Sequence, residues 1–158
     1  SAICLKAGRR RTTFANSAGR FPKMIHSTSA TSSAVVDASL LVDAVSELGR
    51  FVTRLVGVRL HAPVTIDAEV VQALRRRWLL KKLDDEQAHA ALALFRRYDI
   101  ERHSVQPFVD RMWSMRHNVT AYDAGYVALA ESLNVPLLTR DRRLAHSSGH
   151  AARIEFIA

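Results

Sequence analysis

The fold is decided by a short stretch, Val35-Val36-Asp37-Ala38-Ser39, in which an apolar run ends in an acid and a hydroxyl residue. An apolar run without polar alternation is typical of a parallel strand, which is buried on both faces. Ser39 is a favourable N-cap for a helix over the apolar residues that follow. A buried strand that passes directly into a helix predicts an α/β domain.

The rest of the chain repeats this alternation of short apolar runs and amphipathic stretches. We expect helices over 51–58, from Glu69, from Asp84 or Asp85, from Pro107 and from Thr120. Between and after them we expect strands at 100–105, 137–139 and 154–157, and a short strand or an extended entry into the next helix at 62–66. The sequence therefore predicts an α/β fold with a parallel sheet that helices cover on both faces.

Four acids lie where these expected elements begin or end. Asp37 and Asp141 follow apolar strands, whereas Glu69 and Asp123 lie in the first turns of helices. Because the carboxyl ends of parallel strands meet at one edge of the sheet, we expect the four side chains to lie close together. Each acid alone is also compatible with a turn or a helix cap. The set of four favours a functional site.

Such a cluster of carboxylates indicates a particular chemistry. Neighbouring carboxylates repel one another and raise their own pKa values. A divalent cation removes the repulsion, and oxygen ligands favour Mg²⁺ or Mn²⁺. The sequence therefore predicts a metal-dependent chemistry on phosphate groups.

Other candidate motifs are weaker. His146 and His150 are four residues apart, but Ser147-Ser148-Gly149 between them favours a loop, and zinc is not expected without a nearby cysteine. The sequence contains no glycine-rich phosphate loop and no serine nucleophile elbow. Two readings stay open for the basic residues 75–77 and 81–82: contact with phosphates, or a solvated helix face. The scattered histidines are interpreted as surface or interface residues: His61, His89, His103 and His117.

Charge divides the chain into two parts. Of the net charge of +8, residues 1–36 carry +6, with six Lys or Arg and no acid, and residues 37–158 carry +2, with 17 basic and 15 acidic residues. Residues 1–33 are Ser-, Thr- and Arg-rich, and their composition predicts disorder. We leave three interpretations of this segment open: a basic arm that contacts nucleic acid, a targeting peptide, or an artefact of the assigned start, with Met24 as the true one. The ordered domain is expected over 34–158.

Two further features bound the class of protein. No apolar run reaches the roughly 20 residues that a membrane-spanning helix requires. The single cysteine, Cys4, excludes an internal disulfide and is compatible with a reducing cytoplasm. Trp78 and Trp113 lie within amphipathic patterns and are expected to be core or dimer anchors.

The acidic stretches resemble those of PIN-domain ribonucleases, specifically the VapC-type toxins of type II toxin–antitoxin pairs. The resemblance runs from about residue 35 to the C-terminus. Its most specific part is Thr-Ala-Tyr-Asp-Ala at 120–124, followed by Ala-Leu-Ala-Glu at 128–131. The stretch at 137–144 resembles the family's fourth motif, with Thr139 at the usual hydroxyl position, and 35–39 resembles its first strand with the first catalytic acid.

The resemblance implies a PIN-like α/β fold, with a central parallel sheet of about five strands, and a cytoplasmic endoribonuclease that uses Mg²⁺ or Mn²⁺. It implies a homodimer, a VapB-like antitoxin as partner, and RNA as substrate, with tRNA or rRNA as the expected class. Catalytic roles are carried over to four acids, of which all but Glu69 are expected to bind metal: Asp37, Glu69, Asp123 and Asp141. Residues expected to orient the site or hold the substrate phosphate are Thr139, Ser39, Arg140 and Arg142.

Two alternatives remain. A catalytically silent PIN-like domain would bind RNA or a protein partner and need no metal. A phosphotransfer domain would use Asp37 as phosphoacceptor. One such family would place a second aspartate at the position of Ser39, and another would require paired acids before the strand and a later lysine; neither pattern is evident.

Overall fold

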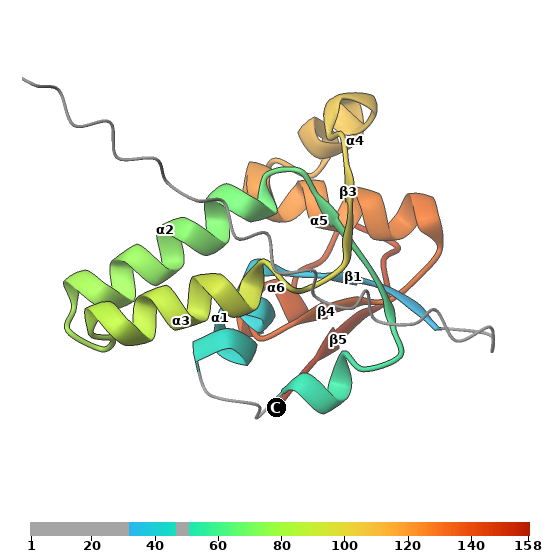
Figure 1. Cartoon of the computed structure of the whole chain (residues 1–158). Helices are drawn as coiled ribbons and strands as arrows, with labels where there is room; N and C mark the ends of the chain where they lie inside the picture. The colour runs from blue at the N-terminus through green and yellow to red at the C-terminus, as the bar shows by residue number, and fades with distance from the viewer. Residues whose placement is uncertain (1–31, 47–50) are drawn as a thin grey trace, which may run out of the picture.

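The structure is a computed structural model that describes residues 32–46 and 51–158, so the expectations for residues 1–31 lie outside it (Figure 1). Its centre is a five-stranded sheet in the order β3-β2-β1-β4-β5, in which all neighbouring strands are parallel. The strands are β1 (Ser33–Val36), β2 (Arg59–Pro63), β3 (Ile100–His103), β4 (Leu137–Thr139) and β5 (Ile154–Phe156). The predicted parallel α/β sheet is confirmed.

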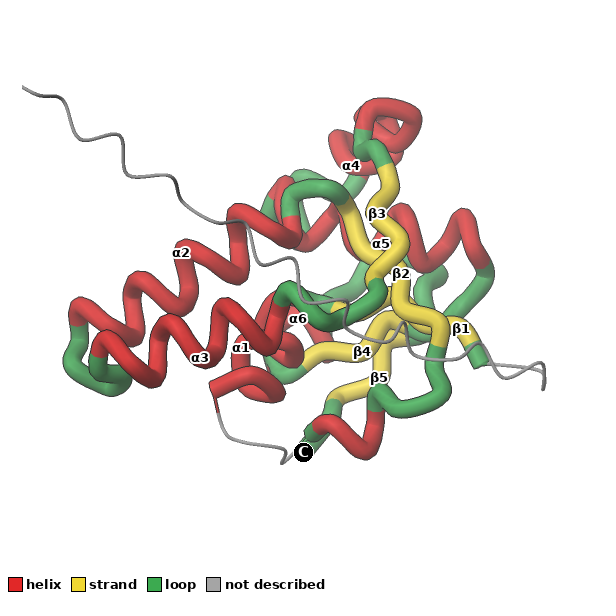
Figure 2. The backbone as a smooth tube through the Cα atoms, in the orientation of Figure 1, coloured by secondary structure: helices red, strands yellow, loops and turns green. Residues whose placement is uncertain are grey.

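Helices cover both faces of this sheet. Figures 1 and 2 show α1, α2 and α3 on one side and α5 on the other, with α2 and α3 packed together as a pair that extends away from the sheet. The α-helices are α1 (Ala38–Ser46), α2 (Ile66–Leu79), α3 (Asp85–Phe95), α4 (Val109–Ser114), α5 (Ala121–Leu133) and α6 (Arg142–Ala145). Short 3₁₀ turns lie at η1 (Val52–Arg54) and η2 (Gln106–Phe108). No helix in the described part of the chain is long and apolar enough to cross a membrane.

The middle of the sheet is the core of the molecule. Val35 and Val36 of β1 are fully buried, as expected for a strand with neighbours and helices on every side. Tyr126 and Val127 of α5 are equally buried against them. β1 thus holds the residue that follows it, Asp37, in a fixed position.

The direction in which the chain adds strands to the sheet changes between β1 and β4. From β1 the chain builds outward through β2 to β3, then returns through α4 and α5 to the other side of β1. Where the connections that follow two neighbouring parallel strands run in opposite directions, the carboxyl ends of the strands border a crevice. Open α/β sheets bind ligands there. Asp37 follows β1 and Asp141 follows β4 at this point.

Two predicted caps are confirmed in the structure. Asp84 accepts a hydrogen bond from the backbone of Gln87, whose side chain accepts one from the Asp84 backbone, and this reciprocal pair starts α3. The Thr120 hydroxyl accepts a hydrogen bond from the backbone N–H of Asp123 and starts α5. The Thr120 cap fixes the first turn of α5, and with it the position of Asp123.

Three local predictions were wrong. β2 covers residues 59–63 instead of 62–66, because Pro63 ends the strand and the acids at 67 and 69 favour a helix that begins at Ile66. The helix expected over 51–58 is reduced to η1, and Gly57 follows with a φ of +74° that interrupts a right-handed helix. Ser39 lies inside α1 and is not its cap, since its hydroxyl hydrogen-bonds to Asp37.

The two tryptophans lie at the surface. Trp113 is 69% exposed on α4, so it is not a core residue, and Trp78 is exposed near the end of α2. β1 begins at Ser33, one residue before the expected start of the ordered domain.

Candidate active site

Asp37 is the most buried of the four acids, with 6% of its surface exposed. Its Oδ2 accepts hydrogen bonds from the hydroxyls of Ser39 and, at 2.7 Å, Thr139. Its backbone N–H donates to Leu138 of β4 at 3.0 Å, which ties the end of β1 to the neighbouring strand. Burial raises the pKa of Asp37; the two hydroxyls oppose this rise, and the charge of Asp123 adds to it.

Glu69 reaches the same place from the first turn of α2. Burial raises the pKa of its carboxyl group, and the charges of Asp37 and Asp123 add to the rise. The hydroxyls of Thr65 and Tyr126 lie close enough to oppose this rise, but the buried Oε1 of Glu69 has no hydrogen bond of normal geometry among the described residues. Burying a carboxylate oxygen without a hydrogen-bond donor costs free energy. The position therefore favours a bound cation or a hydrogen-bond donor at this oxygen.

Asp123 completes a group of three from the first turn of α5. The Thr120 hydroxyl donates to its Oδ2 at 2.7 Å, which orients the carboxylate. Its charge contributes to the raised pKa values of both Asp37 and Glu69, so the three carboxylates lie within electrostatic reach of one another. The structure therefore brings together three of the four predicted acids.

Asp141 is placed beside this group but is engaged differently. Its Oδ1 caps α6 by accepting hydrogen bonds from the backbones of Arg143 at 2.7 Å and Leu144 at 3.4 Å. Its own N–H donates to the Thr139 hydroxyl at 2.9 Å, and that same hydroxyl donates to Asp37. Thr139, which is fully buried, thus links Asp141 to the central carboxylate, and Oδ2 is left out of the cap.

The arginine side chains are directed to other partners. The guanidinium of Arg140 binds Asp43 at 2.6 Å and the Ile157 carbonyl at 2.8 Å, although its backbone N–H donates to Ser39 at the site. Arg142 packs over the ring of Phe156. Both guanidinium groups contact other residues of the chain, and a role of Arg140 and Arg142 in holding a phosphate stays a prediction.

Asp43 on α1 is held by basic partners. Its carboxylate pairs with both Arg77 and Arg140, and only 13% of its side chain is exposed. It joins α1, α2 and the segment after β4.

The three central carboxylates fit a divalent cation. None of Asp37, Glu69 and Asp123 forms an ion pair with a Lys or Arg anywhere in residues 32–46 and 51–158. Their oxygens and the unpartnered Oε1 of Glu69 offer the hard donors that Mg²⁺ and Mn²⁺ prefer. The carboxylates therefore lack the positive charge that such a cation supplies.

Tyr126 is a residue of this site that the sequence reasoning missed. It is fully buried, and its hydroxyl lies next to the carboxylate of Glu69. Burial raises its pKa above the ordinary value, and the charges of Glu69 and Asp37 add to the rise. The signal was present, because Tyr126 is three residues after Asp123 and lies on the same helix face.

The structure also corrects the interpretation of two histidines as scattered. His61 on β2 and His103 on β3 lie next to each other, with Nδ1 of the first 3.0 Å from Nε2 of the second. Glu101 lies beside both rings. Burial lowers the pKa of His61, whereas the charge of Glu101 acts in the opposite direction.

Comparisons with known proteins agree with this architecture. The family model described as "PIN domain" matches residues 34–149. Ribonuclease VapC1 of Mycobacterium tuberculosis is 43% identical over 128 residues, which span 78% of this chain and 96% of that protein.

Two solved structures share the fold. PAE2754 from Pyrobaculum aerophilum aligns with a TM-score of 0.59 at 20% identity, over 78% of this chain and 90% of that one. VapBC-5 from Mycobacterium tuberculosis, titled as a member of the VapBC family of toxin–antitoxin systems, aligns with a TM-score of 0.51 at 23% identity, over 80% and 98% of the two chains. The chain belongs to the PIN-domain family and, within that family, to the VapC ribonucleases.

Proposed function

We propose that the protein is an endoribonuclease toxin that hydrolyses RNA phosphodiester bonds with the help of Mg²⁺ or Mn²⁺. The observation that carries the proposal is the group of Asp37, which is buried, and Glu69 and Asp123, which are partly exposed, without a basic partner in the described chain. The similarity to proteins named as VapC ribonucleases supports the choice of RNA as substrate. The parallel sheet of a PIN domain supplies the frame.

Each acid has a distinct part in this proposal. Asp37 and Asp123 would hold the cation directly, and Asp141 would do so through a water with its Oδ2. Glu69 would bind the cation or accept a proton from the attacking water, a role suited to a carboxyl group whose pKa is raised by burial. A bound Mg²⁺ or Mn²⁺ would supply positive charge to the scissile phosphate and lower the pKa of the water that attacks phosphorus.

The hydroxyl residues keep the carboxylates oriented. Ser39 and Thr139 both donate to Oδ2 of Asp37, which leaves Oδ1 to face a cation. Thr120 does the same for Oδ2 of Asp123. Oriented donors of this kind raise the precision with which a ligand is held.

RNA would reach the site along the surface between α2 and α5. Arg75 and Arg76 are exposed on α2, about two turns beyond Glu69, where they can contact a phosphate further along the strand. Tyr122 is 64% exposed next to Asp123 and offers a ring on which a base can stack. A single-stranded or looped RNA, such as those exposed in tRNA or rRNA, fits an open site of this kind.

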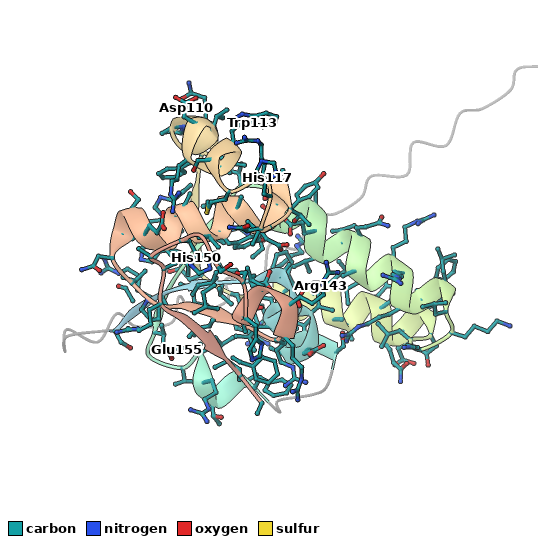
Figure 3. The ribbon with its side chains drawn as sticks, turned by 180° about the vertical axis from the view of Figure 1, so that it is seen from behind. Asp110, Trp113, His117, Arg143, His150 and Glu155 are labelled. Atoms are coloured by element: carbon teal, nitrogen blue, oxygen red, sulfur yellow. The ribbon has the colours of Figure 1, made fainter. Side chains whose placement is uncertain are left out.

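We infer a protein antitoxin and a second copy of this chain as partners. The inference of an antitoxin rests on the likeness to a VapBC toxin–antitoxin protein. The exposed side chains of Val109 and Trp113 on α4 support a protein interface there, and Figure 3 shows Trp113 on this helix, which stands apart from the sheet.

Cleavage of total RNA by the purified, partner-free protein tests the proposed function. We expect discrete fragments in Mg²⁺ or Mn²⁺, none in EDTA, and none from Asp37→Asn. The matched control is Asp110→Asn, which changes an exposed acid on α4 (Figure 3). RNA bound without cleavage in either metal, by a folded wild-type protein, would favour a silent RNA-binding domain instead.

A further inference from the structure

A second group of metal-ligating side chains lies on the edge of the sheet. It consists of His61 on β2 and of Glu101 and His103 on β3. The strands are in register, with His61 opposite Glu101 and Pro63 opposite His103. Because side chains alternate along a strand, all three ligands project from the same face of the sheet.

The distances suit a single small ion. Nδ1 of His61 lies 3.0 Å from Nε2 of His103, and these nitrogens lie 3.6 Å and 3.7 Å from the two oxygens of Glu101. Two imidazole nitrogens bound to one Zn²⁺ at roughly 2.0–2.1 Å must themselves lie roughly 3.0–3.5 Å apart. The imidazole nitrogens already have this spacing, and rotation of the exposed Glu101 carboxylate brings an oxygen into range.

We propose that His61, Glu101 and His103 form a second cation site, which takes a borderline transition metal such as Zn²⁺ and ties the edge strand β3 to β2. Two imidazoles and one carboxylate are a ligand set of zinc sites that keep a fourth position open for water. The nitrogen donors disfavour Mg²⁺, which prefers oxygen.

The surroundings of the three residues support a cation rather than a simple polar contact. His61 is only 7% exposed, so its Nδ1 is a buried polar atom directed at the other two ligands. No Lys or Arg in the described chain forms an ion pair with Glu101. The neighbouring basic residue, Arg102, projects from the opposite face of the strand and binds Asp67 at 2.7 Å.

This site is independent of the acidic site. His61 pairs in register with Val35, two residues before Asp37, and its side chain lies on the sheet face where Pro63 packs near Gly125 of α5. The charges that act on His61 are those of Glu101, His103 and Arg59, and the catalytic acids are not among them. The metal in this second site is therefore structural in our proposal, because β3 is otherwise held in the sheet by β2 alone.

Metal titration of the full chain tests the proposal. Asp37→Asn with Asp123→Asn serves as the parent protein, since these changes weaken the competing acidic site. We expect calorimetry to detect one equivalent of Zn²⁺ in the parent, Co²⁺ to give visible absorption bands of a low-coordinate site, and Zn²⁺ to raise Tm by several degrees.

Three variants of this parent decide the outcome. Glu101→Gln and His103→Gln should each weaken Zn²⁺ binding at least about tenfold and remove the Co²⁺ bands. His117→Gln, an exposed histidine outside the site (Figure 3), should change neither. Glu101 is exposed, so Glu101→Gln tests the site without threatening the fold. The proposal is overturned if the parent binds no Zn²⁺, or if both site variants bind it as tightly as the parent does.

Discussion

Asp37 lies just before α1 and Asp43 lies six residues later within it. Both are largely buried, yet the groups around them carry opposite charges. Asp43 is paired with two arginines, Arg77 and Arg140, from two other parts of the chain. Asp37 is held by the hydroxyls of Ser39 and Thr139 and lies within reach of other acids. The carboxylate of Asp43 stabilises the fold, whereas the carboxylate of Asp37 keeps its negative charge available to a ligand.

The contrast shows how the chain separates stability from function. A buried carboxylate that is paired with guanidinium groups needs nothing further, and removing it leaves two charges without a partner. A group of unpaired carboxylates destabilises the folded protein until a cation binds. Substitutions at the two aspartates should therefore change different properties.

The largest expected effect is on catalysis at Asp37. Asp37→Asn preserves the shape of the side chain but removes its charge, and the rate of RNA cleavage should fall at least about a hundredfold. Single-turnover cleavage of a defined RNA, at saturating protein, measures this rate. Asp43→Asn should retain most of the rate per folded molecule, and an equal loss in both variants would contradict the comparison.

The next effect is on stability at Asp43. Asp43→Ala leaves Arg77 and Arg140 without their anion, and we expect the free energy of unfolding to fall by about 2–4 kcal/mol. Urea unfolding followed by circular dichroism measures it. As a control, Asp67→Ala removes the more exposed partner of Arg102 and should cost about 1 kcal/mol or less.

A smaller effect concerns pH in the absence of divalent metal. The pKa values of Asp37 and Glu69 are raised in the folded protein above their ordinary values of 3.8 and 4.5. In the window above these values the folded state holds protons that the unfolded chain has released. Ionisation then costs the folded state more, so the contribution of both groups to stability falls as pH rises through the raised pKa values.

Thermal unfolding in EDTA at several pH values measures this loss. The double variant Asp37→Asn with Glu69→Gln should lose less stability than the wild type over the same window, since neither amide titrates. Mg²⁺ should flatten the wild-type curve by binding the ionised carboxylates. Identical pH profiles for the two proteins in EDTA would show that these acids are not coupled as described.

The smallest effect is expected at Tyr122, which contacts neither of the two aspartates in any hydrogen bond of the described chain. Tyr122→Ala removes the exposed ring beside the site and should raise the KM for RNA about fivefold, from the loss of about 1 kcal/mol of stacking. Tyr122→Phe keeps the ring and should behave as wild type. A fall in kcat with unchanged KM would assign Tyr122 to the chemistry instead.

Sequence patterns predicted the helices and strands that carry the site better than the contacts between residues far apart in the chain. The alternation of strands and helices, the cap at Thr120 and the acids at strand ends follow from local rules, and the structure agrees with them. The neighbours of Asp43 come from residues 77 and 140, and no local pattern identifies partners at that separation. For the same reason the contact between His61 and His103 cannot be predicted from local patterns, since it depends on the register of β2 against β3.

Boundaries failed where two local preferences competed. Residues 64–66 follow a β-branched pattern that favours a strand, but the acids after them favour the start of a helix, and the helix prevailed. Ser39 is a good cap by composition, yet the hydrogen bond to Asp37 takes its hydroxyl into the site. The role of each of the four acids stays a prediction, and the variants above test those of Asp37 and Glu69.

The hydrogen bond from Thr139 to Asp37 joins residues that are 102 positions apart. Because synthesis runs from the N-terminus, the acids at 37, 69 and 123 are all made before Thr139. A nascent or truncated chain that lacks β4 has the acidic residues but not the hydroxyl or the neighbouring strand that hold them in place. The arrangement around Asp37 can therefore form only after β4 has been made and has paired with β1.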